Sequence, residues 1–195
     1  MGVWIRITRK YLDKGQMIER IIMQSKECQR FSNQVKSHFA YLFDQFNFSV
    51  VYQDEAIDSL GTESCLIVLE SEECRIKIYR SHGEVNVQFG TLSAPLSWQD
   101  HDSDTGQWYY LRGLLSFLRN EKFNIDILLK RKPSWKTDEQ QMAELSRELK
   151  PVCLQIISLF QEDNYPQWKM LYDQYQEEQE REFRKQYRHW EGKRT

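Results

Sequence analysis

Four consecutive segments between residues 48 and 90 have the residue pattern of β-strands, and they constrain the fold more than any other feature of the chain. The segments are FSVVYQ (48–53), SCLIVLES (64–71), CRIKIYR (74–80) and EVNVQFG (84–90). In the third and fourth segments, apolar residues alternate with polar ones, as in strands with one buried and one solvent-exposed face. Gly83, in the connection SHGE, supplies the positive φ angle that a tight hairpin turn needs. The pattern therefore predicts an antiparallel meander.

Amphipathic helices are predicted before and after this meander. Apolar residues recur at spacings of three and four over residues 31–46, 108–118 and 138–159, the spacing of one helix face. Pro151 predicts a kink or a break in the last of these helices, and residues 125–129 fit either a strand or a short helix. We expect an α+β fold with an antiparallel four-stranded meander, an N-terminal helix and C-terminal helices packed on one face, and an extended C-terminal helix.

The patterns divide the 195 residues into three regions. Residues 1–23 are expected to form a peripheral extension, with a strand in VWIRI and a helical turn or two in QMIERIIM, and with Met1, Met17 and Met23 as alternative starts. Residues 24–162 are long enough for one buried core and are expected to form a single α+β domain. Residues 163–195 are expected to form a helical appendage, because Glu177 and Glu180 each precede an arginine by four residues, an arrangement that supports an exposed helix.

Charge and composition exclude several classes of protein. The formal net charge of -2 gives no long-range attraction to nucleic acid or anionic lipid. A mean hydropathy of -0.72 and the lack of a long apolar run argue against a membrane protein. Charged residues interrupt the N-terminal segment where a secretory signal would need an apolar stretch, so we expect a cytoplasmic protein.

The cysteines are predicted to be structural. Cys28, Cys65, Cys74 and Cys153 show no CxxC spacing and lie in otherwise apolar periodic stretches. This pattern predicts buried, reduced thiols rather than a disulfide or zinc framework.

The segment WQDHDSDTGQW (98–108) places Asp100, Asp102 and Asp104 around His101. Their alternation resembles the start of an EF-hand loop, but the sixth position is Thr105 instead of glycine and the twelfth is Leu111 instead of glutamate. We interpret Asp104, three residues before Gln107, as the cap of a helix that begins there. A functional acidic surface or a weak cation site is the alternative.

No other catalytic or metal-binding pattern is found in the sequence. The histidines lack HxH or HExxH spacing, and the chain has no GxSxG, P-loop or GxGxxG motif. We therefore expect no catalytic residues, no metal and no cofactor, and the leading hypothesis is non-enzymatic binding of a protein partner.

Two surfaces are candidates for that partner. One is the acidic loop with Asp100, Asp102, Asp104 and the neighbouring Trp98; the other is an aromatic stripe on the C-terminal helix, formed by Phe183, Tyr187 and Trp190. Packing of the stripe within the chain is the alternative interpretation.

A basic segment supports a second hypothesis, an accessory factor associated with nucleic acid. The segment LLKRKPSWK (128–136) contains Lys130, Arg131, Lys132, Trp135 and Lys136, a mixture that can hold a phosphate backbone and stack a base. The acidic balance of the whole chain favours a simple charged loop instead.

The middle of the chain resembles a group of small uncharacterised bacterial α+β proteins that includes immunity-like proteins of toxin systems. The resemblance lies in FAYLFDQFNFSVVY, CRIKIYRSHGEVNVQFGTL and WYYLRGLLSFL and covers residues 31–118. It implies a cytosolic protein that binds another protein, such as an antagonist or accessory of one partner, and it carries over no catalytic residue.

Overall fold

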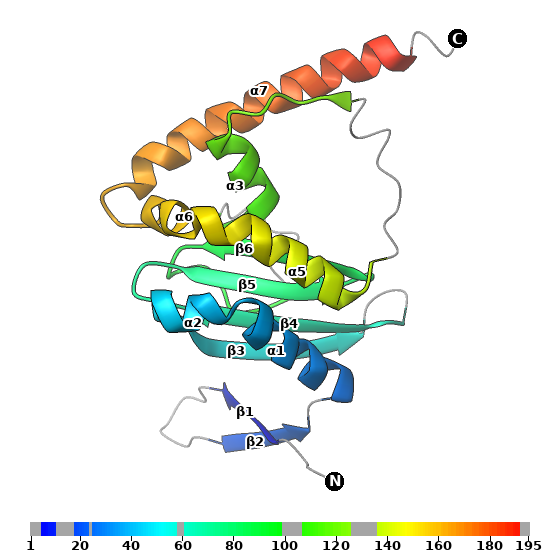
Figure 1. Ribbon diagram of the computed structural model, residues 1–195, viewed down its shortest axis with the longest axis vertical. Coiled ribbons are helices and arrows are strands. Elements are labelled where there is room, and N and C mark those ends of the chain that lie inside the picture. The colour runs from blue at the N-terminus through cyan, green and yellow to red at the C-terminus, as the bar shows by residue number, and fades with distance from the viewer. Residues whose placement is uncertain are drawn as a thin grey trace.

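The protein is built around a five-stranded antiparallel sheet with the strand order β3-β4-β5-β6-β7. The computed structural model describes residues 5–10, 18–23, 25–57, 61–98, 107–125 and 136–191. The strands are β3 (Ser49–Ile57), β4 (Glu63–Glu70), β5 (Arg75–Ser81), β6 (Glu84–Gly90) and β7 (Trp108–Tyr110). Helices α1 (Lys26–His38), α2 (Ala40–Phe46), α5 (Asp138–Leu149) and α6 (Cys153–Leu159) lie over one face of this sheet (Figure 1). The α+β class and the antiparallel sheet are confirmed.

The sheet has one strand more than predicted. Residues 108–110, expected at the start of a helix, pair with Gly90, Phe89 and Gln88 of β6. The helix α3 (Leu111–Leu118) begins only afterwards, and Tyr110 occupies its N-cap without a side-chain hydrogen bond. The helix start predicted near Asp104 is therefore wrong: three aromatic residues with strong strand preference add an edge strand first.

Two of the predicted helices are divided by a break. The predicted first helix is divided into α1 and α2 at Phe39, which remains fully buried. The break predicted at Pro151 is confirmed, because the short 3-10 helix η2 (Lys150–Val152) separates α5 from α6. The hairpin turn is confirmed as well, with positive φ angles at His82 and Gly83.

The core lies between the sheet and the helices. The register places Leu69, Ile76, Phe89 and Tyr109 in one row across four strands, and all four are buried. Phe31 and Val35 of α1 and Met142 and Leu149 of α5 belong to the same buried cluster. The apolar faces of the helices and the apolar face of the strands therefore pack against each other in one core.

The opposite face of the sheet is crossed by residues 91–98. Arg75 donates to the Ala94 carbonyl, Lys77 Nζ lies 3.5 Å from the Ser97 carbonyl, and the rings of Tyr79 and Trp98 meet edge to face. Gly90 permits this path, because a Cβ there would lie 2.8 Å from both Ala94 Cβ and a ring carbon of Trp108. This face is thus covered by the chain itself, and the expectation of one solvent-exposed face is wrong: Lys77 and Gln88, polar residues of the alternating pattern, are buried.

The N-terminal extension contains a separate two-stranded antiparallel sheet, β1 (Ile5–Lys10) with β2 (Ile18–Met23). The strand expected in VWIRI is confirmed in outline. The helical turn expected in QMIERIIM is wrong, since residues 18–23 pair with β1 as an extended strand.

The long helix α7 (Tyr165–Glu191) is anchored at its beginning by aromatic packing. Trp168 and Tyr172 are buried, and the ring centroid of Tyr109 lies 4.8 Å from Trp168 and 5.4 Å from Tyr172. Farther along, α7 runs beside residues 121–125 (Figure 1). Among the described residues, no helix is both long enough and apolar enough to cross a membrane.

Candidate functional site

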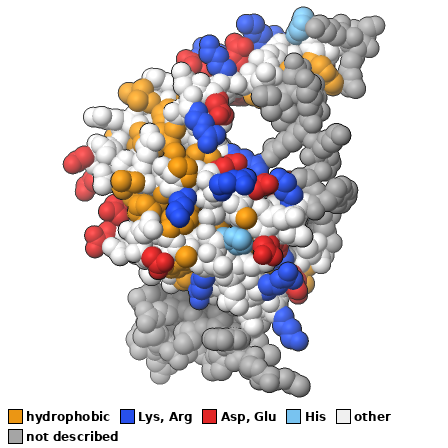
Figure 2. Space-filling view, viewed as in Figure 1, with side chains coloured by type: hydrophobic (Ala, Val, Ile, Leu, Met, Phe, Trp, Pro, Cys, Tyr) orange, Lys and Arg blue, Asp and Glu red, His pale blue; other side chains and the backbone are white. Residues whose placement is uncertain are grey.

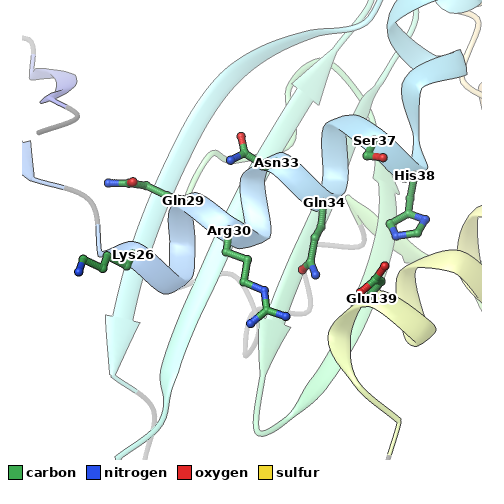
Figure 3. Close-up of a pocket in the computed structure, with 8 residues that line it drawn as sticks. All are labelled: Lys26, Gln29, Arg30, Asn33, Gln34, Ser37, His38 and Glu139. Atoms are coloured by element: carbon green, nitrogen blue, oxygen red, sulfur yellow. The ribbon is translucent and has the colours of Figure 1, made fainter. Parts of the chain in front are cut away.

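A polar groove between α1 and α5 is the candidate functional site. The groove has a volume of about 500 Å³, and a neighbouring hollow of about 260 Å³ continues it toward the N-terminus of α5. In Figure 3, Arg30, Gln34 and His38 point from α1 toward the α5 side, where Glu139 is located. The lining residues are Lys26, Gln29, Arg30, Asn33, Gln34, Ser37, His38 and Glu139.

The sequence of α1 explains why this wall is polar. Cys28, Phe31 and Val35 form its buried face, and the intervening positions carry side chains with charged or amide groups. Ser25 caps the helix by accepting a hydrogen bond from the Cys28 amide at 3.2 Å. An amphipathic helix that buries one face against the sheet must present its other face to solvent.

Arg80 fixes one end of the groove. Its Nη1 lies 2.8 Å from Asp138 Oδ2 at the start of α5 and 3.9 Å from Glu27 Oε2 in the first turn of α1. Its Nη2 donates to the Glu63 carbonyl at 2.8 Å. Only 11% of the Arg80 side chain is exposed, so one nearly buried guanidinium connects both walls to the sheet.

A second connection fixes the other end. Ser146 Oγ of α5 donates to the His38 carbonyl at the end of α1, at 2.6 Å. The Tyr41 hydroxyl in turn donates to the Ser146 carbonyl at 3.5 Å, and burial raises the pKa of Tyr41 well above its usual value. With both ends connected, the two walls are held at a fixed separation.

The groove offers hydrogen-bonding groups of several kinds. Within the described ranges, the side chains of Lys26, Arg30, Asn33, Gln34 and Ser37 form no hydrogen bond or ion pair. Amides both donate and accept, while the two cations only donate. Figure 2 shows Lys and Arg side chains interspersed with Asp and Glu on the helix-covered face, so no single charge dominates it.

The groove does not have the geometry of a hydrolytic triad. Ser37, His38 and Glu139 line it together, but no hydrogen bond joins their side chains in this part of the structure. A nucleophile and its base, and the base and its orienting carboxylate, must lie within hydrogen-bond reach. Across the described residues, no three His, Cys, Asp or Glu side chains are placed to hold a metal ion.

Most of the loop residues that the sequence singled out lie outside the described part of the chain. This applies to Asp100, Asp102 and Asp104 and to Lys130, Arg131, Lys132 and Trp135. Trp98 is described and is half-buried against Tyr79, with ring centroids 6.2 Å apart. Lys136 forms an ion pair with Glu144 at 2.5 Å.

The aromatic stripe of α7 is brought together, and part of it packs within the chain. Phe183 contacts Tyr187, and Tyr187 contacts Trp190, with centroids 5.7 and 5.9 Å apart. Phe183 also meets Phe123 edge to face at 5.3 Å. Phe183 and Tyr187 nevertheless remain 36% and 39% exposed.

The cysteine prediction is half wrong. Cys28 and Cys65 form a disulfide between α1 and β4, with their Cα atoms 5.4 Å apart. Cys74 and Cys153 are free and buried as predicted, and burial raises the pKa of each thiol to about 12. All four side chains were correctly expected to be buried, but sequence spacing does not reveal which of them meet.

The groove residues were not predicted from the sequence. A signal was present, because Lys26, Arg30, Asn33, Gln34 and Ser37 recur on the face of the helix opposite its apolar stripe. That signal alone marks only a solvated face. The second wall comes from Glu139, more than one hundred residues later, and nothing in the local pattern places it there.

In comparisons with protein-family models, curated protein sequences and solved structures, no match to this chain was found.

Proposed function

We propose that this protein is a non-enzymatic binding protein that recognises one protein partner through the groove between α1 and α5. The observation that carries the proposal is a polar groove whose two walls are connected at both ends. Five polar side chains of α1 border it with their hydrogen-bonding groups unused within the described chain. Arg80 and Ser146 connect its walls at the two ends.

Rigid walls favour binding because less conformational entropy is lost when a partner docks. A mobile helix would have to be fixed in place on binding, whereas the backbone of α1 is already held to the sheet through Cys28 and to α5 through Ser146. This supports recognition of a defined surface rather than nonspecific adhesion.

The charges of the groove indicate what kind of segment fits it. Lys26 and Arg30 lie on the α1 wall and Glu139 on the α5 wall. A polar protein segment with an acidic side chain for the α1 cations and a donor for Glu139 complements both walls. The resemblance noted for residues 31–118 extends the proposal to an immunity-like antagonist or accessory, acting in the cytoplasm.

Nucleic-acid binding remains the second hypothesis and gains no specific support. Lys136 is the described member of the basic segment, and its ammonium group is already paired with Glu144. The aromatic stripe of α7 remains a candidate for a second contact with the same partner.

Site-specific photo-crosslinking tests the proposal. A benzophenone amino acid replaces Gln34, which points from α1 toward α5 (Figure 3), and in a matched control it replaces Glu72, which is exposed in the turn between β4 and β5 and does not line the groove. After irradiation in native lysate, we expect one discrete crosslinked protein from position 34 and none from position 72. Equal crosslinking from both positions, or from position 72 alone, would contradict the groove assignment.

A further inference from the structure

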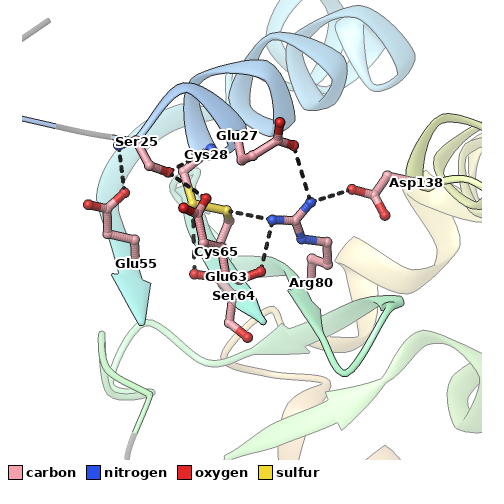
Figure 4. The surroundings of a disulfide bond; sticks show 9 residues. All are labelled: Ser25, Glu27, Cys28, Glu55, Glu63, Ser64, Cys65, Arg80 and Asp138. Atoms are coloured by element: carbon pink, nitrogen blue, oxygen red, sulfur yellow. Dashed lines mark hydrogen bonds and ion pairs between the residues drawn. A yellow bond between two sulfur atoms is a disulfide. The ribbon is translucent and has the colours of Figure 1, made fainter. Parts of the chain in front are cut away.

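The Cys28–Cys65 disulfide connects the first turn of α1 to the middle of the sheet. Both cysteines are buried, and 37 residues separate them in the chain. Figure 4 shows the bond surrounded by Ser25, Glu27, Glu63 and Arg80, the residues that hold the start of α1. Whether this bond is oxidised or reduced therefore affects how firmly the α1 wall of the groove is held.

Each sulfur already faces a group suited to its reduced form. Arg80 Nη2 lies 3.6 Å from Cys65 Sγ, and the carbonyl oxygen of Ser64 lies 3.7 Å from Cys28 Sγ. A guanidinium stabilises a thiolate, and a carbonyl accepts a hydrogen bond from a thiol. The disulfide has no proton to donate to Ser64 and no negative charge to place beside Arg80.

Ser25 caps the helix turn that carries Cys28. Its amide donates to Glu55 Oε2 at 2.9 Å, and its hydroxyl donates to Glu63 Oε2 at 3.1 Å while accepting from the Cys28 amide. These bonds hold a single terminal turn, and helix ends open locally at much lower free-energy cost than the whole molecule unfolds. Opening this turn exposes Cys28 Sγ without unfolding the sheet.

We propose that Cys28–Cys65 is a reversible thiol-exchange site, reduced by a dithiol while the protein stays folded. A thiolate of the reductant attacks Cys28 Sγ and forms a mixed disulfide, and the S–S bond breaks with its electron pair leaving on Cys65 Sγ beside Arg80. The reductant's second thiol, as a thiolate, then attacks the sulfur through which the reductant is bound in the mixed disulfide. This step releases the sulfur of Cys28. Two electrons and two protons pass to the cysteine pair, and the reductant becomes a disulfide.

The exchange has a consequence for the groove. Lys26, Gln29 and Arg30 lie in or beside the released turn, so reduction loosens that end of the α1 wall. This consequence rests on the proposed binding function, whereas the exchange itself does not.

The test uses the full-length oxidised protein, incubated with dithiothreitol at neutral pH without denaturant. Released thiols are counted by alkylation and mass spectrometry, and hydrogen exchange is followed by peptide. We expect two new thiols, unchanged exchange in β5 and β6, and faster exchange confined to the first turns of α1. Reduction that occurs only at the rate of global unfolding would show a permanent structural bond and overturn the proposal.

Two variants sharpen the result. Ser25→Ala removes the cap and should speed reduction about fivefold, the effect expected for an N-cap serine. Because Arg80 also holds the start of α1, Arg80→Gln is compared in the Ser25→Ala background, where the turn is already released. There it should slow reduction by removing the cation beside Cys65 Sγ, while Arg75→Gln, which alters a sheet arginine paired with Glu70, should not. An unchanged rate in both Ser25→Ala and Arg80→Gln would contradict the assigned roles, and these rates do not depend on any partner.

Discussion

At the scale of single residues, burial decides the chemistry of the free thiols. Cys74 and Cys153 are fully buried, and desolvation raises the pKa of each thiol from 9.0 to about 12. Desolvation also raises the pKa of the Tyr172 hydroxyl, from 10.0 to about 12. All three groups are neutral when protonated. The folded protein therefore holds their protons at a pH where the unfolded chain has lost them.

This difference predicts a loss of stability in alkali. Below about pH 9 the contribution of these groups is fully present, and it declines as the pH rises toward 12, by at most about 1.4 kcal/mol per pH unit for each group. Urea unfolding between pH 8 and pH 11 measures the decline. Cys153→Ala should show a shallower decline than the wild type, and a free energy of unfolding that stays constant to pH 11 would contradict the assignment.

The conformation and contacts of a single residue could be predicted where they depend only on its neighbours in the sequence. Gly83 was placed in the hairpin turn from its neighbours alone, and its φ angle of 75° confirms this. The pairing of Cys28 with Cys65 was not predictable, because it depends on how α1 lies across β4. The same limit applies to Arg80, which resembles any outward-facing strand residue in the sequence but is nearly buried under two helix ends.

At the scale of elements, α7 is held along residues 121–125 by side-chain hydrogen bonds to the backbone. Tyr175 and Gln179 donate to the Glu121 carbonyl at 2.8 and 3.1 Å. Gln186 donates to the Phe123 carbonyl at 3.0 Å and accepts from the Ile125 amide at 2.9 Å. The amide of Gln186 thus serves as donor and acceptor for a segment, residues 121–125, that belongs to no strand.

Replacing Gln186 should detach this segment from the distal part of α7. Gln186→Ala removes both hydrogen bonds and should lower the local stability by about 1 to 3 kcal/mol, seen as faster hydrogen exchange at Ile125. Gln174→Ala, at an exposed position of the same helix, is the matched control and should leave Ile125 unchanged. Equal exchange in the two variants would show that aromatic packing alone holds the segment.

Elements were predictable where periodicity extends over several turns or residues. The meander, the break at Pro151 and the C-terminal helix all follow from patterns in the sequence. Strand β7 was missed because three residues are too few to show alternation, and Trp108 and Leu111 also fit the helical spacing. The extended strand at residues 18–23 was missed because its pairing with β1, rather than its own pattern, determines its conformation.

At the scale of the molecule, the groove depends on contacts between distant parts of the chain. The hydrogen bond from Ser146 to His38 spans 108 residues, and the ion pair from Arg80 to Asp138 spans 58. No local pattern encodes such contacts, so the α+β class could be predicted but the site could not. Disulfides are rare in cytosolic proteins, so the Cys28–Cys65 bond gives no support to the cytoplasmic location expected from the sequence.

Binding of a protein partner in the α1–α5 groove can be tested by quantitative affinity capture with charge-reversed variants. Lys26→Glu with Arg30→Glu reverses the α1 wall opposite Glu139, while Arg119→Glu with Lys122→Glu makes the same charge change at exposed positions that do not line the groove. We expect nuclease-treated native lysate to yield one partner at near-equal stoichiometry with the wild type and with the control variant. With the groove variant, we expect recovery to fall at least tenfold. Equal recovery with both variants, or recovery of nucleic acid instead of a protein from untreated lysate, would show that the groove is not the binding site.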